Sequence, residues 1–163
     1  MRYLTRREVW AALPVVAAMG RGGAGAQVAA GDLLKSAVFD VERMPARKMA
    51  NGGESWSLLH GVLATGETVA VHESQQAAGA VPNPAHRIEH SEFIFILEGT
   101  VDFLHDGKVE RVGPGGVIYV SDGTLHQVKN VGDVTARYVV VAVGGDVAAD
   151  QPGKNVPQGL KPF

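Results

Sequence analysis

The sequence feature that decides the fold is the stretch PAHRIEHSEFIFILEG, residues 84–99. Its second half is strongly apolar and predicts a strand buried on both faces, and therefore a central one. In its first half, four residues stand two apart: His86, Ile88, His90 and Glu92. On a continuous strand their side chains would share one face. Imidazole nitrogens and a carboxylate oxygen that converge there would suit a divalent transition metal.

The rest of the chain reads as short apolar segments separated by glycine-rich turns, without helical periodicity. The dipeptide Asp106-Gly107 is a hairpin signal between two such segments. Eight short strands at regular spacing predict an all-β sandwich or barrel. The predicted strands cover residues 55–63, 67–73, 92–98, 100–105, 108–112, 117–120, 125–131 and 135–143.

A second polar segment, residues 115–130, carries one further histidine of interest. His126 and Asn130 have the same parity along the last part of this segment, so a strand would present them on one face. Taken alone, His126 fits a packed core residue better than a metal ligand.

Together the two segments resemble the two motifs of the cupin family. The first motif, H-x-H-x(3,4)-E-x6-G, is matched by His86, Glu92 and Gly99. In the second motif, G-x5-P-x-G-x2-H-x3-N, Ser121 replaces the proline. The other positions of this motif are matched by Gly115, Gly123, His126 and Asn130. The resemblance covers about residues 67–143.

The resemblance implies an all-β fold, a cupin-type antiparallel β-barrel (double-stranded β-helix or jelly roll), with one divalent transition metal inside. His86, Glu92 and His126 are the implied ligands. Ile88 stands at the family's second histidine and cannot coordinate a metal. His90 either supplies the missing imidazole, if the strand twists or bulges there, or it lies at the rim or donates a hydrogen bond to Glu92. Iron or manganese is favoured for two histidines and a carboxylate, while zinc, nickel, cobalt and copper stay open.

The resemblance leaves the chemistry open, because cupins support many activities. We expect a metalloenzyme acting on a small organic substrate, with dioxygenase-type or related chemistry, that is, a metal-dependent oxidoreductase. The alternatives are a non-catalytic cupin that binds a small ligand or sugar at a metal site degenerate at Ile88, and a structural barrel. The expected substrate-binding residues are His72, Ile88, Phe95 and Tyr119. A homodimer that pairs by exchange of edge strands is expected in every case.

The N-terminal residues 1–26 combine a basic start, a short apolar run and a small-residue stretch ending in Ala-Gly-Ala, which predicts an export signal. Thr5-Arg6-Arg7 resembles a twin-arginine signal. The expected location is therefore periplasmic or secreted. The apolar run is too short to span a bilayer, so no stable membrane insertion is expected after cleavage. The barrel domain is predicted over 27–145, followed by a polar tail over 146–163.

Length and composition set outer bounds on these expectations. The 163 residues suit one domain with a real core. The chain has no cysteine, so it forms no disulfide and holds no cysteine-bound metal. A formal net charge of −2 without a basic patch argues against a nucleic-acid partner.

Overall fold

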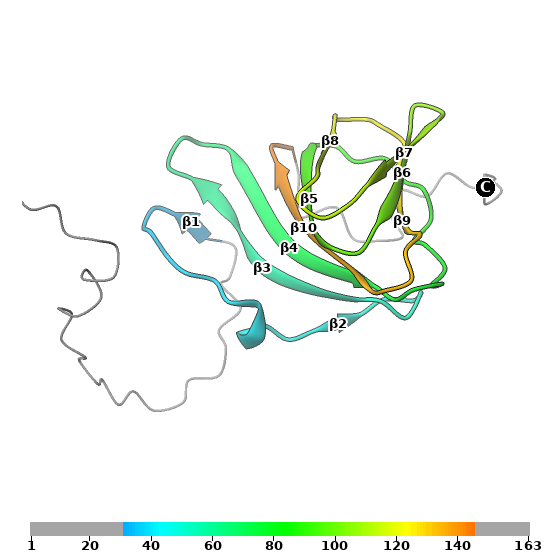
Figure 1. Cartoon of the computed structure of the whole chain (residues 1–163). Coiled ribbons are helices and arrows are strands. Elements are labelled where there is room, and N and C mark those ends of the chain that lie inside the picture. The colour runs from blue at the N-terminus through cyan, green and yellow to red at the C-terminus, as the bar shows by residue number, and fades with distance from the viewer. Residues whose placement is uncertain (1–30, 146–163) are drawn as a thin grey trace, which may run out of the picture.

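The computed structural model describes residues 31–145 of the chain (Figure 1). The predicted export signal over 1–26 and the predicted polar tail over 146–163 lie outside these residues. Within the described part, no helix has the length and apolar character that a membrane span requires.

The described chain is built from ten strands and one short 3-10 helix, η2 (Val41–Arg43). The strands are β1 (Gly31–Leu33), β2 (Arg47–Lys48), β3 (Glu54–Leu63), β4 (Thr68–Gln76), β5 (Ser91–Glu98), β6 (Val101–His105), β7 (Lys108–Val112), β8 (Val117–Val120), β9 (His126–Asn130) and β10 (Ala136–Val143).

These strands form two sheets that pack against each other (Figure 1). The larger sheet has the order β1-β3-β4-β10-β5-β8, with β2 paired to β3 at one end. The smaller sheet has the order β7-β6-β9. All pairings are antiparallel except the pairing of β1 with β3. The all-β prediction is therefore confirmed, with sequence neighbours such as β4 and β5 separated by the inserted strand β10.

The eight predicted strands are all present, and their ends differ from the predicted ones by at most three residues. Three short N-terminal elements were not predicted: η2, and the strands β1 and β2, which both pair with β3. β1 and β2 have three and two residues, too few for a period-two pattern to be visible.

Residues 86–92 do not form the continuous strand on which a shared face would depend. β5 begins at Ser91, close to the predicted start at residue 92, and the chain bends just before it. The alternation of burial nevertheless persists across the bend, since Ile88 and His90 are buried like Glu92.

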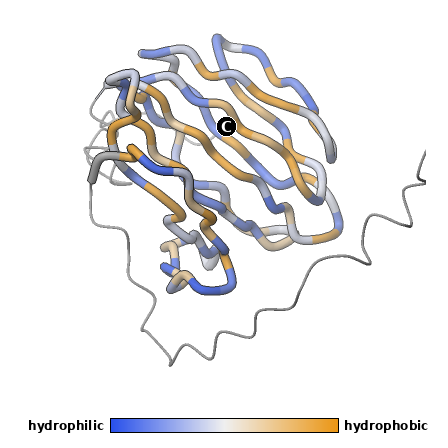
Figure 2. Tube along the Cα trace, turned by 90° about the vertical axis from the view of Figure 1, so that its left-hand side faces the viewer, coloured by the Kyte–Doolittle hydropathy of each residue, from blue (hydrophilic) through white to orange (hydrophobic). Residues whose placement is uncertain are grey.

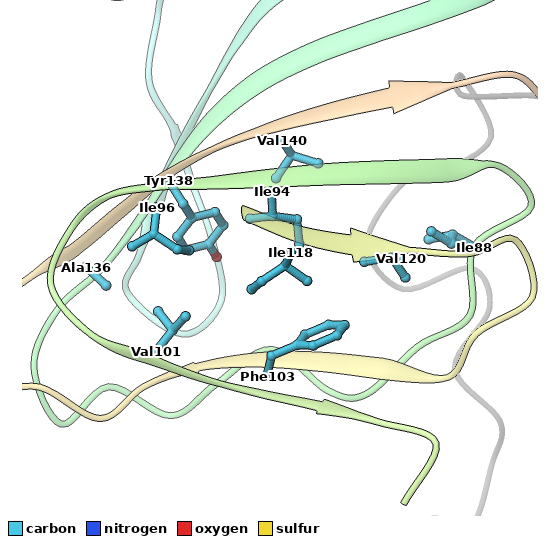
Figure 3. Close-up of a cluster of buried hydrophobic side chains, with 10 residues drawn as sticks. All are labelled: Ile88, Ile94, Ile96, Val101, Phe103, Ile118, Val120, Ala136, Tyr138 and Val140. Carbon is cyan, nitrogen blue, oxygen red and sulfur yellow. The ribbon is translucent and has the colours of Figure 1, made fainter. Parts of the chain in front are cut away.

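The hydrophobic core fills the space between the two sheets (Figure 3). On β5 the even-numbered side chains Ile94 and Ile96 face this core, while Phe93, Phe95 and Leu97 alternate with them and are exposed. β5 is thus internal to the sheet, between β10 and β8, but only one of its faces is covered within residues 31–145. The buried cluster comprises Ile88, Ile94, Ile96, Val101, Phe103, Ile118, Val120, Ala136, Tyr138 and Val140.

Candidate functional site

The candidate site lies at one end of the core, where three separate segments of the chain meet. Glu92 projects from the inner face of β5. His126 is the first residue of β9, and His86 lies in the connection before β5. The backbones of His86 and His126 exchange two hydrogen bonds, of 3.0 and 2.9 Å, in an isolated bridge. This bridge brings the two sequence motifs together, with the imidazole ring centroids 4.5 Å apart.

A second contact fixes the loops that carry these motifs. The backbone N–H of Gly123 donates to the carbonyl of Ile88 at 2.9 Å. The guanidinium of Arg87 donates in turn to the carbonyl of Gly123. The turn at Gly123 adopts a φ of +74°, a left-handed conformation that favours glycine. Gly123 of the second motif therefore forms the turn that holds the two motif segments against each other.

Glu92 is the centre of the polar group. Glu92 is 8% exposed, and its two carboxylate oxygens face different imidazoles. Oε1 lies 3.0 Å from Nε2 of His90, which is hydrogen-bond distance. Oε2 lies 3.8 Å from Nε2 of His126, which is too long for a direct hydrogen bond. A buried carboxylate is costly unless it is paired, and here imidazoles are its neighbours.

Backbone carbonyls orient two of the imidazoles. Nδ1 of His126 lies 3.1 Å from the carbonyl oxygen of Thr124. Nδ1 of His86 lies 3.3 Å from the carbonyl oxygen of Pro84. A carbonyl can only accept, so this geometry assigns the proton to Nδ1 in each ring and leaves Nε2 with a lone pair. That is the tautomer in which histidine commonly binds a metal through Nε2.

Burial favours the neutral form of two imidazoles, those of His72 and His126. Burial lowers the pKa of His126, and the neighbouring His86 lowers it further. Burial is also the main reason that the pKa of His72 is lowered. For Glu92, burial opposes ionisation, but the hydrogen bond from His90 and the nearby imidazoles outweigh it and lower the pKa of the carboxyl. Neutral imidazole beside ionised carboxylate is the protonation state that metal ligands require.

The structure separates the other predicted site residues. His72 lies on β4 and pairs with Val140 on β10, which in turn pairs with Ile94 on β5. His72 therefore projects from the inner face of the large sheet, as Ile94 does. Phe95 and Tyr119 project from the opposite face of the large sheet and are 40% and 57% exposed. They are therefore not brought to the face that carries Glu92.

Ile88 occupies a different environment from the histidines around it. It is 1% exposed and belongs to the hydrophobic cluster, where Figure 3 places it at one end beside Val120. The position of the family's second histidine is thus taken by a core side chain.

Sequence reasoning missed a buried polar network further along the same face. The side-chain amide of Gln76 donates to the hydroxyl of Tyr138 at 2.8 Å, and its oxygen accepts from the backbone N–H of Asn130 at 3.2 Å. Burial raises the pKa of Tyr138 to about 12, so the phenol stays protonated. Gln76 has the same parity on β4 as His72, and this alternation was the signal that could have found it.

Asn130 has a structural role. Its side-chain amide donates to the carbonyls of Gln76 and Val134 at 2.9 and 2.8 Å, and its oxygen accepts from the N–H of Gly132 at 3.0 Å. It holds the backbone after β9 and has no contact with Glu92 among these bonds.

Within residues 31–145, no group of three or more His, Asp or Glu side chains is already arranged to hold a metal ion. What the structure shows instead is a buried carboxylate with one close and one more distant imidazole, and a pair of imidazole rings. Nitrogen and oxygen atoms that could bind a metal thus lie near one another, but they are not arranged as the ligands of one ion.

Comparison with known structures finds many similar folds at low sequence identity. An RmlC-like cupin from Shewanella frigidimarina is 16% identical with a TM-score of 0.58, and the match covers 69% of this chain and 96% of that one. The polyketide cyclase RemF from Streptomyces resistomycificus is 19% identical with a TM-score of 0.54, covering 72% and 90%. A sugar phosphate isomerase of the cupin superfamily from Silicibacter pomeroyi is 19% identical with a TM-score of 0.54, covering 67% and 76%. At these identities the likeness shows the fold alone.

Sequence comparison agrees with the fold. No curated protein matches the chain. The family model of the cupin domain matches residues 72–142, from the middle of β4 to the last residue but one of β10. This range includes both motif segments and the polar group around Glu92. Residues 72–142 thus match the model of the cupin domain, and the described part of the chain has the cupin fold.

Proposed function

We propose that this protein is a metal-binding cupin that acts on a small organic substrate. The observation that carries the proposal is the buried carboxylate of Glu92, which faces imidazoles from two separate segments of the chain. His86, Glu92 and His126 are the proposed ligands. Two histidines and one carboxylate suit iron or manganese and leave coordination positions open for a substrate.

The chemistry of the donor set fits such a metal. Nε2 of His86 and of His126 carry lone pairs, because Nδ1 of each ring faces a backbone carbonyl. Ligand atoms bound to one ion at about 2.1 Å lie about 3–4 Å from each other. The 3.8 Å between Oε2 of Glu92 and Nε2 of His126 falls in that range. An ion shared between these atoms would compensate the burial of the carboxylate.

His90 supports this set as a positioning residue. Its Nε2 lies 3.0 Å from Oε1 of Glu92, and an ionised carboxylate can only accept a hydrogen bond. His90 therefore donates through Nε2 and orients Glu92. Direct coordination by His90 is the competing role, and it would require this hydrogen bond to be given up.

A bound metal would supply Lewis-acid or oxygen-activating chemistry at this position. The chain's own residues orient the imidazoles and line the inner face around them. Thr124 fixes the ring of His126 through its carbonyl, and His72 adds a neutral imidazole to the inner face that a substrate would meet. Dioxygenase-type or related chemistry, and so a metal-dependent oxidoreductase, is the proposed class.

A second candidate function rests on Ile88. Because this side chain fills core space where the family places a histidine, the metal site can be read as degenerate. The protein would then bind a small organic ligand or sugar without catalysis.

We further propose that the protein is exported and is periplasmic or secreted. The basic, apolar and small-residue regions of residues 1–26 support this location. A twin-arginine route would carry the folded chain, which allows the metal to be loaded before export.

Metal content separates the two candidate functions. The protein is purified, analysed for transition metals, and then reconstituted anaerobically with Fe(II) or Mn(II). About one bound ion per chain is expected for the metal-binding cupin. Failure to take up any of these ions would exclude it and leave the ligand-binding cupin.

The role of His90 needs a variant that keeps its hydrogen bond. His90→Gln retains an N–H donor for Glu92 but removes the imidazole. Metal affinity within about tenfold of the unmodified protein would place His90 outside the coordination sphere, consistent with the usual effect of outer contacts. A loss as large as that of His126→Ala would make His90 a ligand.

A further inference from the structure

The inner face of the large sheet changes character from β5 toward β3. Residues directly opposite each other in antiparallel strands project from the same face. On β10 and β5 the inner positions are apolar apart from Glu92, while on β4 and β3 they are polar or small. Figure 2 shows the mixture of hydrophilic (blue) and hydrophobic (orange) stretches along the strands of the sheet. The cross-strand rows from β3 to β5 are His60, Ala70, Ala142 and Glu92; Ser57, His72, Val140 and Ile94; and Ser55, Ser74, Tyr138 and Ile96.

The row that contains Glu92 is occupied by small side chains. Ala142 and Ala70 stand between Glu92 and His60, and each contributes only a methyl group. Ala142 is buried, whereas Ala70, His60 and the neighbouring His72 are partly exposed. A molecule bound beside Glu92 can therefore extend along this row toward β3, where it meets imidazoles rather than large hydrophobic side chains.

β2 continues the polar part of the inner face by one strand. Arg47 pairs with Ser55 of β3, so its side chain projects from the same face as that of Ser55. The next residue, Lys48, pairs with Glu54 and projects from the opposite face. Both cationic side chains are exposed. These two neighbouring cations are thus directed to opposite faces of the sheet, and of the two only Arg47 is on the face that carries Glu92.

Arg47 differs from the other arginines of the described chain in having no acceptor. Within residues 31–145, its guanidinium makes no hydrogen bond and no ion pair. A guanidinium carries five N–H donors and stays charged at neutral pH, so Arg47 is open to an anionic ligand. The other four arginines each face a carboxylate or a carbonyl: Arg43 with Asp40, Arg87 with Gly123, Arg111 with Asp102, and Arg137 with Glu73 and Glu98.

His72 lies between Arg47 and Glu92. Burial is the main cause of its lowered pKa, but the negative charge of Glu92 raises this pKa and the positive charge of Arg47 lowers it. Since charges much more than about 10 Å apart in solution barely affect each other, His72 is near both groups. The strand register agrees, because the row of His72 lies between the row that Arg47 extends and the row of Glu92. Arg47, His72 and Glu92 thus follow one another across the inner face.

We propose that the molecule bound at this site is a small organic anion, whose carboxylate or phosphate group is held by Arg47 at the β2 edge of the inner face. The proposal rests on the proposed function, because it assigns the substrate class of the same site. A guanidinium matches two oxygens of either group with parallel N–H donors. The negative charge of Glu92 repels the anionic end, so that end lies at Arg47 and the rest of the molecule extends past His72 toward Glu92.

Ligand titration followed by amide NMR spectra tests the proposal on the metal-free, full-length protein at constant ionic strength. The probes are benzoate, phenyl phosphate and the neutral benzamide. At least one of the two anions should bind and shift the amide signals of β2 and β4. Benzamide should bind about tenfold more weakly or not at all, since it lacks the charge that Arg47 recognises. The two anions separate a carboxylate ligand from a phosphate ligand.

Two neighbouring substitutions localise the binding. Arg47→Gln should weaken binding of the anion by about tenfold or more. Arg47→Lys keeps the charge without the two parallel donors and should weaken binding less. The matched control is Lys48→Gln, which removes the same charge from the opposite face and should leave the affinity unchanged. Both side chains are exposed, so the variants should fold, and circular dichroism checks this.

Equal losses in Arg47→Gln and Lys48→Gln would overturn the proposal, as would equal binding of benzamide and the anions, or no binding of any probe. These outcomes are separate from those of metal analysis. Mn(II) uptake without anion binding would overturn the proposal and leave a metal-binding cupin with a different substrate class. Anion binding that depends on Arg47, without Mn(II) uptake, would uphold Arg47 as the anion site in a ligand-binding cupin.

Discussion

Ile88 offers a sharp test of the core, because it stands at a ligand position of the motif but packs as a hydrophobic residue. It is 1% exposed within the buried cluster. Ile88→Ala removes three carbon atoms, and at ~0.8 kcal/mol for each buried group the lost transfer free energy is about 2.4 kcal/mol. The cavity left behind raises the expected loss to about 3–4 kcal/mol, within the usual range for large-to-small core changes.

Urea denaturation measures this loss as a shift of the midpoint. With a typical dependence on urea, about 3 kcal/mol lowers the midpoint by roughly 1–3 M. The control is Val109→Ala at an exposed position, which should change the free energy of unfolding by less than about 0.5 kcal/mol. A loss at position 88 below about 1 kcal/mol would refute the placement of Ile88 in the core. Metal uptake by Ile88→Ala should match that of the unmodified protein, because the side chain touches the core and not the ion.

Three further predictions concern other parts of the barrel. Because burial lowers the pKa of His72 and His126 below 6.5, the unfolded chain binds more protons than the folded chain under acidic conditions. The free energy of unfolding of the metal-free protein should therefore fall as the pH decreases below about 6.5, and His72→Gln should flatten this dependence in denaturation at pH 5.5 and 7.5. Arg137→Met should cost about 2–3 kcal/mol by urea denaturation, since it leaves the buried carboxylate of Glu73 without two hydrogen bonds, and adding Glu73→Gln should recover part of the loss. Gly99→Ala should cost about 2 kcal/mol and lower the melting temperature, because φ at this residue is +75° and an added Cβ would lie 2.7 Å from the backbone of β10; an unchanged melting temperature would contradict this geometry.

Much of the fold could be predicted because its strands alternate regularly. In β10 every second residue from Ala136 to Ala142 is buried, and the same pattern recurs in β8. Glycine and Asp-Gly turns separate these strands, so eight of the ten described strands and their approximate limits follow from local sequence. The edge strands β1 and β2 could not be found in this way, since their pairing with β3 depends on partners that lie far along the chain.

The candidate site was only partly accessible to sequence reasoning. Motif spacing identified His86, Glu92 and His126, and the structure brings their segments together. The direction of Phe95 could not be inferred, because the strand is apolar at both parities and the pattern does not say which face is covered. The hydrogen bonds of Arg137 to Glu73 were also hidden, since the two residues are 64 positions apart.

Metal affinity of Glu92→Gln tests the central claim most directly. Mn(II) is titrated calorimetrically into the unmodified protein, Glu92→Gln and Glu110→Gln. Glu110 is the control, because its carboxylate lies on β7 at the surface. Removing a charged ligand should weaken binding at Glu92 by about 100-fold or more, or about 2.7 kcal/mol, while the control keeps its affinity. Equal affinity of the three proteins, or no binding by any of them, would contradict a metal site built on Glu92.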